Sequence, residues 1–362
     1  MVFGLVKRSL GHALVRTTTA ADAYGSAVWS TVIEPESIVF RDAVAPPFAP
    51  EAAHLDPTRY ETPPAASATL QGALYYSYLD VLLTRRRAVL RDTGNTHIRN
   101  ATRPAADTFY WRNLYFQPIE EITGVSFVLR SPANNFYHTI IDNLPRLYAL
   151  HLPRYRDLEI ALLVSGALLP YEEYFLPRLL PANVRVRRVR RNRLHRLETA
   201  IFSSYLSREL SGYLPRRYLD FFLERTLPPR PRQKRNRIYV TRRASAVRRQ
   251  IVNESEVLQA VQRFGFVTYA LEELPLSAQI ELFFDAEAVV APHGAGLTNL
   301  LFADHVAVIE LHPAQAVFPH YYFLCQAMGH PYRFVCADAA LSQSDFMVDI
   351  DALNRALREL AG

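Results

Sequence analysis

Short apolar runs alternate with helical patterns through the second half of the chain. After residue 237, the strand-length runs "RIYV", "VTYA", "AVVAP" and "VAVIEL" are separated by segments whose apolar residues recur three and four positions apart. Short apolar strands separated by helices are typical of a parallel sheet covered on both faces. The pattern predicts an α/β domain over residues 238–340. In its first helix, Asn253 and Glu256 have the spacing of a capping box.

The first half of the chain is less regular. "YHTIIDNLPRLYAL" (137–150) is helical in period until its proline, "EIALLVS" (159–165) is typical of a buried strand, and "LDVLLTRRRAVLRDTG" (79–94) alternates as strands do. Prolines and like charges favour a linker at 228–237. The expected organisation is an N-terminal domain over 1–227, with 1–110 poorly defined, the linker, the domain over 238–340, and an amphipathic helix within 341–362 that can pack back on the N-terminal domain.

Composition limits the class of protein. With 362 residues and 49% apolar residues, the chain can bury two cores of ordinary size. Cys325 and Cys336 lack metal-knuckle spacing and are too few for a disulfide framework. The formal net charge is +6, and lysine supplies only two of the 41 basic residues. Arginine favours phosphate and carboxylate partners. No apolar run is long enough to span a bilayer, so we expect a cytoplasmic protein that can rest peripherally on an anionic membrane.

A glycine-rich turn follows the third strand of the C-terminal domain. In "VVAPHGAGLTNLLF" (289–302), His293, Gly294, Ala295 and Gly296 lie between a strand and a helix start. Ligands of parallel α/β sheets bind at this edge, and a helix start offers N–H groups to an anion. Such a turn can equally serve tight packing alone. Thr241 and Arg242 leave the first strand at the same edge, so the Arg242 guanidinium can reach the same anion.

Nearby arginines have a plainer interpretation. Arg243, Arg248 and Arg249 follow Arg242 in a charge run, and charge runs are usually solvated. We therefore assign the anion to Arg242, which follows the strand directly.

The order and spacing of these segments resemble glycosyltransferase family 61, which contains plant xylosyl- and arabinosyltransferases and animal N-acetylglucosaminyltransferases. The resemblance covers roughly residues 110–335, and one of its segments is "FYHTIIDNLPRLYAL". The other segments are "IYVTRR", "RQIVNESEV", "LPLSAQIELFFDAEAVVAPHGAGLTNLLF" and "VIELHP". The resemblance implies a GT-B architecture, with two Rossmann-like domains facing across a cleft. It also implies an inverting transfer of sugar from a nucleoside diphosphate sugar, expected to be UDP-linked, to a hydroxyl of a glycan or polysaccharide.

The resemblance also implies a donor site. By position, Thr241, Arg242 and the backbone around His293, Gly294, Ala295 and Gly296 meet the diphosphate. Thr298 and Asn299 can add hydroxyl and amide contacts. Basic side chains and helix dipoles can stabilise a departing diphosphate. "DID" (349–351) opens a helix and is better explained as capping, so we expect no obligatory metal or cofactor.

Two carboxylates have open roles. Glu310 ends the fourth strand and can accept hydrogen bonds from ribose hydroxyls or pair with an arginine. His138 and Asp142 are four residues apart on one helical face, where a carboxylate beside an imidazole makes a general base. We assign Asp142 as base and His138 as partner, although the roles can be exchanged, and the pair can also be structural. Arg146 is expected to brace the domain interface.

Three other functions compete with this interpretation. A nicotinamide-dependent oxidoreductase would have its glycine turn after the first strand, followed by an acidic residue that binds the ribose. In this sequence the turn follows the third strand, and no acidic residue lies at the expected distance. A sugar-nucleotide-binding protein without catalysis would use the same fold. "NVRVRRVRRNRLHR" (183–196) raises nucleic-acid binding, but it lacks a recognition motif and alternates as a strand with a wet arginine face. We expect a glycan acceptor and no nucleic-acid partner.

Overall fold

The chain divides into two compact units. The computed structural model describes residues 16–41, 44–94, 114–131, 133, 135–242, 250–313, 317–337 and 345–361. Unit 1 comprises Met1–Pro35 and Pro63–Glu209, and unit 2 comprises Glu36–Thr62 and Leu210–Gly362. The boundary near residue 210 precedes the one expected at 227. Unit 2 also takes a segment from the N-terminal half, which the sequence pattern did not predict.

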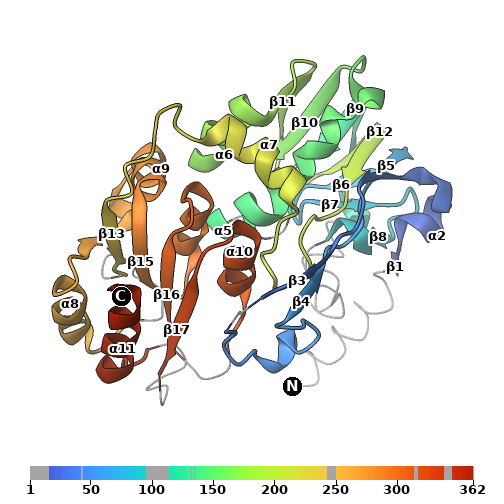
Figure 1. Ribbon diagram of the computed structural model, residues 1–362. Helices are drawn as coiled ribbons and strands as arrows, with labels where there is room; N and C mark the ends of the chain where they lie inside the picture. Colours follow the sequence, from blue (N-terminus) through green and yellow to red (C-terminus); the bar gives the residue numbers. More distant parts are fainter. Residues whose placement is uncertain are drawn as a thin grey trace. The chain divides into compact units, whose positions relative to one another are not determined.

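Unit 2 is built on the parallel sheet that the sequence predicts. Its five strands lie in the order β14-β13-β15-β16-β17, and every neighbouring pair is parallel (Figure 1). The strands are β13 (Asn236–Val240), β14 (Val267–Tyr269), β15 (Ala286–Pro292), β16 (Ala307–His312) and β17 (Tyr332–Cys336). In chain order this is 2-1-3-4-5, so the direction of winding reverses between β13 and β15. Such a switch point opens a crevice at the carboxyl ends of the two strands.

The described helices of unit 2 include α7 (Arg216–Thr226), α8 (Glu254–Gln262), α9 (Leu276–Phe284), α10 (His320–Met328) and α11 (Ile350–Ala361). Two of these, α8 and α11, pack on its sheet. Tyr239, Val290 and Ile309 are in register across β13, β15 and β16, and they share a core with Val257 of α8 and Leu353 of α11. Burying each large apolar side chain contributes about 1.5–3 kcal/mol, so α8 and α11 are held to this face. The sequence placed the closing helix against the N-terminal domain, but its described packing is within unit 2.

Local capping in unit 2 differs in one place. The Asn253 amide does not cap α8; it donates to the Val348 carbonyl at 3.0 Å and accepts from the Val348 N–H at 2.9 Å. The capping box with Glu256 is therefore absent, because a partner 95 residues away satisfies the amide instead. Asp349 does cap α11, accepting from the Ala352 N–H at 2.9 Å, as expected of "DID".

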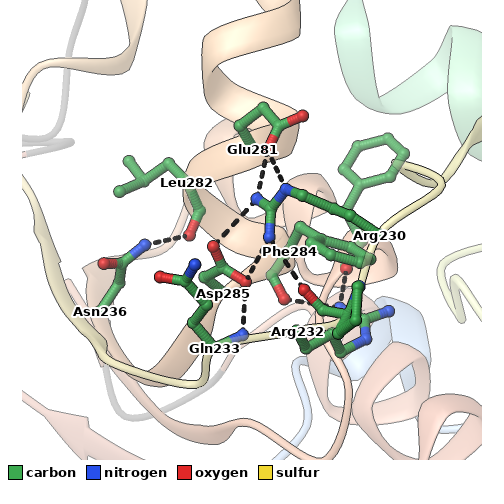
Figure 2. Close-up of polar contacts among 10 residues, drawn as sticks. Arg230, Arg232, Gln233, Asn236, Glu281, Leu282, Phe284 and Asp285 are labelled. Carbon is green, nitrogen blue, oxygen red and sulfur yellow. Dashed lines mark hydrogen bonds and ion pairs between the residues drawn. The ribbon is translucent and has the colours of Figure 1, made fainter.

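The expected linker is packed against α9. Arg230 donates to both carboxylate oxygens of Asp285, at 2.9 and 3.1 Å, and also pairs with Glu281 (Figure 2). Arg232 donates to the Phe284 and Phe302 carbonyls, at 2.6 and 2.7 Å. The hydrogen bonds from Arg230 lower the pKa of Asp285. The arginines that suggested a solvated spacer thus fasten residues 230–232 at the end of α9, inside unit 2.

Residues 36–62 join unit 2 through aromatic packing. The segment contains the antiparallel pair β3 (Ser37–Val39) and β4 (Arg59–Glu61). Tyr60 stacks on Tyr213 with ring centroids 4.5 Å apart, and it also lies 5.3 Å from the ring of Phe323. The Tyr60 and Ser211 hydroxyls are hydrogen-bonded at 2.7 Å. These contacts account for the segment's place in unit 2.

Unit 1 contains a mixed sheet of ten strands. Parallel pairing connects β12, β9, β10 and β11, whereas β5 and β6 pair antiparallel with β12. The strands are β1 (Thr17–Thr18), β2 (Trp29–Ile33), β5 (Ala65–Gln71), β6 (Leu74–Tyr76), β7 (Val81–Leu83), β8 (Val89–Leu90), β9 (Ile119–Val128), β10 (Ile160–Ser165), β11 (Val184–Val189) and β12 (Leu194–Ser203). The fold is therefore α/β as expected, but this sheet is parallel only in part.

Helical segments of unit 1 follow the parallel strands. They include α2 (Ala20–Tyr24), α5 (Phe136–His138) and α6 (Pro170–Leu179). Arg130 follows β9 and forms a buried ion pair with Glu172 of α6, and it also donates to the Ser165 carbonyl at the end of β10. This arginine ties the carboxyl ends of two parallel strands to the helix beside them. Among the described helices of both units, none is long and apolar enough to cross a membrane.

Candidate functional site

The switch point of unit 2 brings Arg242 to the glycine loop. Arg242 follows β13 and donates from Nη1 to the His293 carbonyl at 2.9 Å. A Cβ atom built on Gly294 would lie only 2.6 Å from that Nη1. Gly294 has an extended backbone, with φ 171°, which any residue can adopt. Glycine is favoured here because a side chain would occupy the position of the Arg242 guanidinium. The predicted convergence of the guanidinium and the loop is therefore present.

The loop continues into a 3-10 helix, Ala295–Phe302, where the sequence predicted an α-helix start. Gly296 packs closely against its neighbours, because an added Cβ would be 3.0 Å from Cδ1 of Leu271, in a 3-10 turn, and 3.8 Å from Cγ1 of Val240, in β13. The first N–H groups of a helix have no acceptor within it, so they give this turn a positive end. The loop therefore combines the two roles considered from the sequence: its glycines allow tight packing, and its N–H groups can bind an anion.

A cavity of about 240 Å³ opens at this switch point. Arg242 and Pro292 line it from the ends of β13 and β15, and Glu254 lines it from the start of α8. Its other lining residues are Gln250, Ile251, Val252 and Ser255. A guanidinium and a helix N-terminus on one cavity favour an anionic group. Arg243, Arg248 and Arg249 lie outside the described residues.

His138 and Asp142 are in contact in unit 1. His138 Nδ1 and Asp142 Oδ2 are 2.6 Å apart, and the two side chains are 28% and 19% exposed. Asn135 caps the segment by accepting from the His138 N–H at 3.0 Å. The helical path does not end at Asp142: it widens into a π turn, Thr139–Asn143, and continues as a 3-10 helix, Leu144–His151. An imidazole–carboxylate pair that reaches solvent can accept a proton from a bound hydroxyl.

Comparison with known proteins bears on the class of the protein. The family model described as Glycosyltransferase 61 matches residues 136–309. This stretch belongs to glycosyltransferase family 61. An EGF domain-specific O-linked N-acetylglucosamine transferase from Drosophila melanogaster is 34% identical over 99 residues, which cover 26% of this chain and 19% of the relative. The matched stretch is thus about one fifth of that relative's length, while the glycosyltransferase 61 region includes His138, Asp142, Arg242 and the glycine loop.

Glu310 lies beside the glycosyltransferase 61 region and anchors the His293 ring. The carboxylate is 1% exposed, and its Oε1 lies 2.6 Å from His293 Nδ1. Its Oε2 accepts from the Tyr332 hydroxyl at 2.7 Å and lies 3.3 Å from His312 Nε2. Burial raises the pKa of Glu310, but the combined effect of His312 and His293 is larger and opposite. The pKa of Glu310 is therefore well below its usual range. Glu310 is therefore an ionised partner of histidines, where the sequence left open ribose contacts or an arginine pair.

The same three residues form a metal-capable set. Ligand atoms of His293, Glu310 and His312 lie within 4.8 Å of one another, and two imidazoles with a carboxylate suit a zinc-type ion. In the structure these atoms are hydrogen-bonded or ion-paired to each other. His312 is 1% exposed and belongs to this buried network.

Three other predicted donor residues have buried side chains. The Thr241 hydroxyl donates to Glu254 at 2.6 Å, and Thr241 is 6% exposed. Asn299 is fully buried and donates to Gln279 Oε1 and the Gly296 carbonyl, each at 3.0 Å. Thr298 is fully buried as well. A side-chain contact with a phosphate needs exposure that Thr298 and Asn299 lack, and the hydrogen bonds of Asn299 assign this residue to bracing the loop.

Glu254 is the residue that sequence reasoning missed. It lines the cavity and accepts hydrogen bonds from Thr241 and Tyr239, the latter at 3.0 Å. The available signal was its place at the start of the helix that follows the first strand, where capping drew attention to Asn253 and Glu256 instead.

Arg146 also acts differently from its prediction. It is 1% exposed and donates to the carbonyls of Val128, Leu129 and Ser203, at 2.9 to 3.1 Å. Burial lowers the pKa of the guanidinium. All three carbonyls are in unit 1, so Arg146 braces the inside of that unit beneath the His138–Asp142 helix.

Proposed function

We propose that the protein is an inverting glycosyltransferase that moves a sugar from a UDP-linked donor to a hydroxyl of a glycan or polysaccharide. The observation that carries the proposal is the Arg242 guanidinium, which lies over Gly294 beside a cavity at the switch point of unit 2. Membership of residues 136–309 in glycosyltransferase family 61 supports the reaction class. The GT-B arrangement expected from the sequence is part of this proposal.

In the donor half, Arg242 and the N–H groups of the glycine loop bind the diphosphate. As the bond between the anomeric carbon and the diphosphate oxygen breaks, its electron pair passes to the diphosphate. A guanidinium and helix N-terminal N–H groups stabilise that growing charge without a metal ion. Glu254, which lines the same cavity, accepts hydrogen bonds from hydroxyls of the donor.

In the acceptor half, Asp142 is the general base. The acceptor hydroxyl gives its proton to Asp142 while its oxygen attacks the anomeric carbon from the face opposite the diphosphate. One direct displacement inverts the configuration at that carbon. His138, 2.6 Å from the carboxylate, holds Asp142 in place and can share the proton.

Ligand binding tests the donor half first. We expect UDP and one UDP-sugar to raise the melting temperature of the full chain, and EDTA to leave that shift unchanged. The relative's name makes UDP-N-acetylglucosamine the first donor to try, followed by UDP-xylose and UDP-arabinose. Stabilisation by NAD(P) and by no nucleoside diphosphate would favour an oxidoreductase and refute the donor site.

A substitution then separates catalysis from binding. Asp142→Asn keeps the size of the side chain but removes the base, so transfer should fall at least a hundredfold while UDP binding stays unchanged. Wild-type protein that binds the donor but transfers to no glycan, and hydrolyses none, would favour the non-catalytic binding protein.

A further inference from the structure

The positive charge of the chain is concentrated on one edge of unit 1. Residues 170–196 contain eight arginines and two glutamates. Their excess of six positive charges equals the formal net charge of the whole 362-residue chain. The remainder of the chain is neutral by the same count. One short segment therefore carries an excess of charge that equals the protein's net charge.

Five of these arginines lie on or just beyond an edge strand. β11 pairs with β10 alone and ends the ten-stranded sheet (Figure 1). Arg185, Arg187 and Arg188 on the strand are exposed, and so are Arg190 and Arg191 just beyond it. Successive side chains of a strand point to opposite faces, so the arginines spread around the edge on both sides.

Among the described residues, none of the five arginines at 185–191 forms an ion pair with a carboxylate. Arg216 of α7, by contrast, is exposed and forms an ion pair with Asp220 at 2.7 Å. Charges that are not neutralised by neighbours act on whatever approaches the surface. The edge is thus available to an anionic partner.

An apolar groove accompanies the charges. A cavity of about 410 Å³ lies between α6 and β11. Its apolar lining residues are Leu168, Leu176, Pro177, Leu180, Pro181, Ala182, Val184 and Val186. Val186, between Arg185 and Arg187, is 37% exposed. Of the two glutamates that line the groove, Glu172 is buried in its ion pair with Arg130, which leaves Glu173 as the exposed acidic group.

We propose that the arginine edge, residues 185–191 together with the groove against α6, docks on the surface of an anionic phospholipid bilayer. Guanidinium groups bind lipid phosphates in a bidentate manner. Apolar side chains beside them can enter the boundary between head groups and acyl chains. A nucleic acid would match the charge but leave the apolar groove without a partner, so the combination favours a bilayer.

Vesicle sedimentation with the full chain tests the proposal. We expect binding to vesicles of phosphatidylcholine with phosphatidylglycerol, little binding to phosphatidylcholine alone, and release as salt shortens the range of the charges. Each arginine near an anionic surface contributes about fivefold to partitioning. Arg187→Gln with Arg188→Gln should therefore weaken binding roughly 25-fold, whereas the two lysine substitutions at these positions should retain most of it.

A matched control removes the same charge elsewhere. Arg216→Gln with Arg225→Gln also lowers the net charge by two, but these α7 arginines are paired with Asp220 and Glu224. This pair should change vesicle binding by less than threefold. Val186→Ser should weaken binding severalfold without any change in charge, and circular dichroism melts check that each variant folds.

Several outcomes would overturn the docking surface. Equal losses in the β11 and α7 variants would mean that net charge alone governs binding. Equal binding to neutral vesicles, or none to anionic ones, would remove the bilayer as partner. Tighter binding to duplex RNA than to vesicles at equal phosphate concentration would assign the edge to nucleic acid.

Discussion

Gly294→Ala provides a direct test of the donor site. The new Cβ would lie 2.6 Å from Nη1 and 3.4 Å from Cζ of Arg242. The flexible end of the arginine can move, and φ 171° suits alanine, so the free energy of unfolding should change by less than about 1 kcal/mol. The displaced guanidinium loses its bond to the His293 carbonyl and its place over the loop. A hydrogen bond to a charged group contributes about 1.5–3 kcal/mol, so diphosphate affinity should fall roughly 10- to 150-fold.

Calorimetric titration with UDP measures this loss in a double-mutant cycle. Gly294→Ala, Arg242→Ala and the double variant are compared with the wild type. If both substitutions act through the same guanidinium, the double variant should bind UDP no more weakly than Arg242→Ala. Unchanged affinity in Gly294→Ala, or losses that simply add, would refute the assignment of Arg242 to the diphosphate.

Three further substitutions probe buried polar groups. Arg146→Met leaves three carbonyls without their donor and should lower the free energy of unfolding by about 3–5 kcal/mol in urea titrations, against no measurable change for exposed Arg196→Gln. Burial lowers the pKa of His330 to about 4, so protonation of this histidine opposes folding. The free energy of unfolding should therefore be highest above pH 6.5 and fall by roughly 3 kcal/mol as the pH drops towards 4. His330→Asn should flatten that part of the stability profile. Glu310→Gln changes the buried carboxylate that contacts His293, His312 and Tyr332 and should lower the free energy of unfolding by about 1–3 kcal/mol, whereas no change would show that these contacts do not stabilise the fold.

The structural features that could be predicted from the sequence are those that depend on local residue patterns. The parallel strands of unit 2 are short apolar runs bounded by helices, and strand ends of one sheet share an edge, so the approach of Arg242 to Gly294 could be predicted. The four-residue spacing of His138 and Asp142 likewise predicted their contact, and the π turn kept it.

What could not be predicted depends on distant partners. Gln71 pairs with Thr199 across β5 and β12, and nothing in either strand alone indicates an antiparallel pairing over that separation. Asn253 has the sequence signature of a cap, yet Val348 satisfies its amide. The role of Glu310 depends on its burial beside His293 and His312, and the pattern of its strand does not predict those two contacts.

The Glu36–Thr62 segment makes unit 2 discontinuous, with consequences for how this chain can be cut or recombined. A fragment that begins at Leu210 would expose the faces of Tyr213 and Phe323 that Tyr60 now covers, and Ser211 would lose its hydroxyl partner. A chimera that replaces unit 2 with that of a relative should therefore exchange residues 36–62 and 210–362 together. Substitutions at Tyr60 and Tyr213 should then be tolerated in compensating pairs more readily than singly.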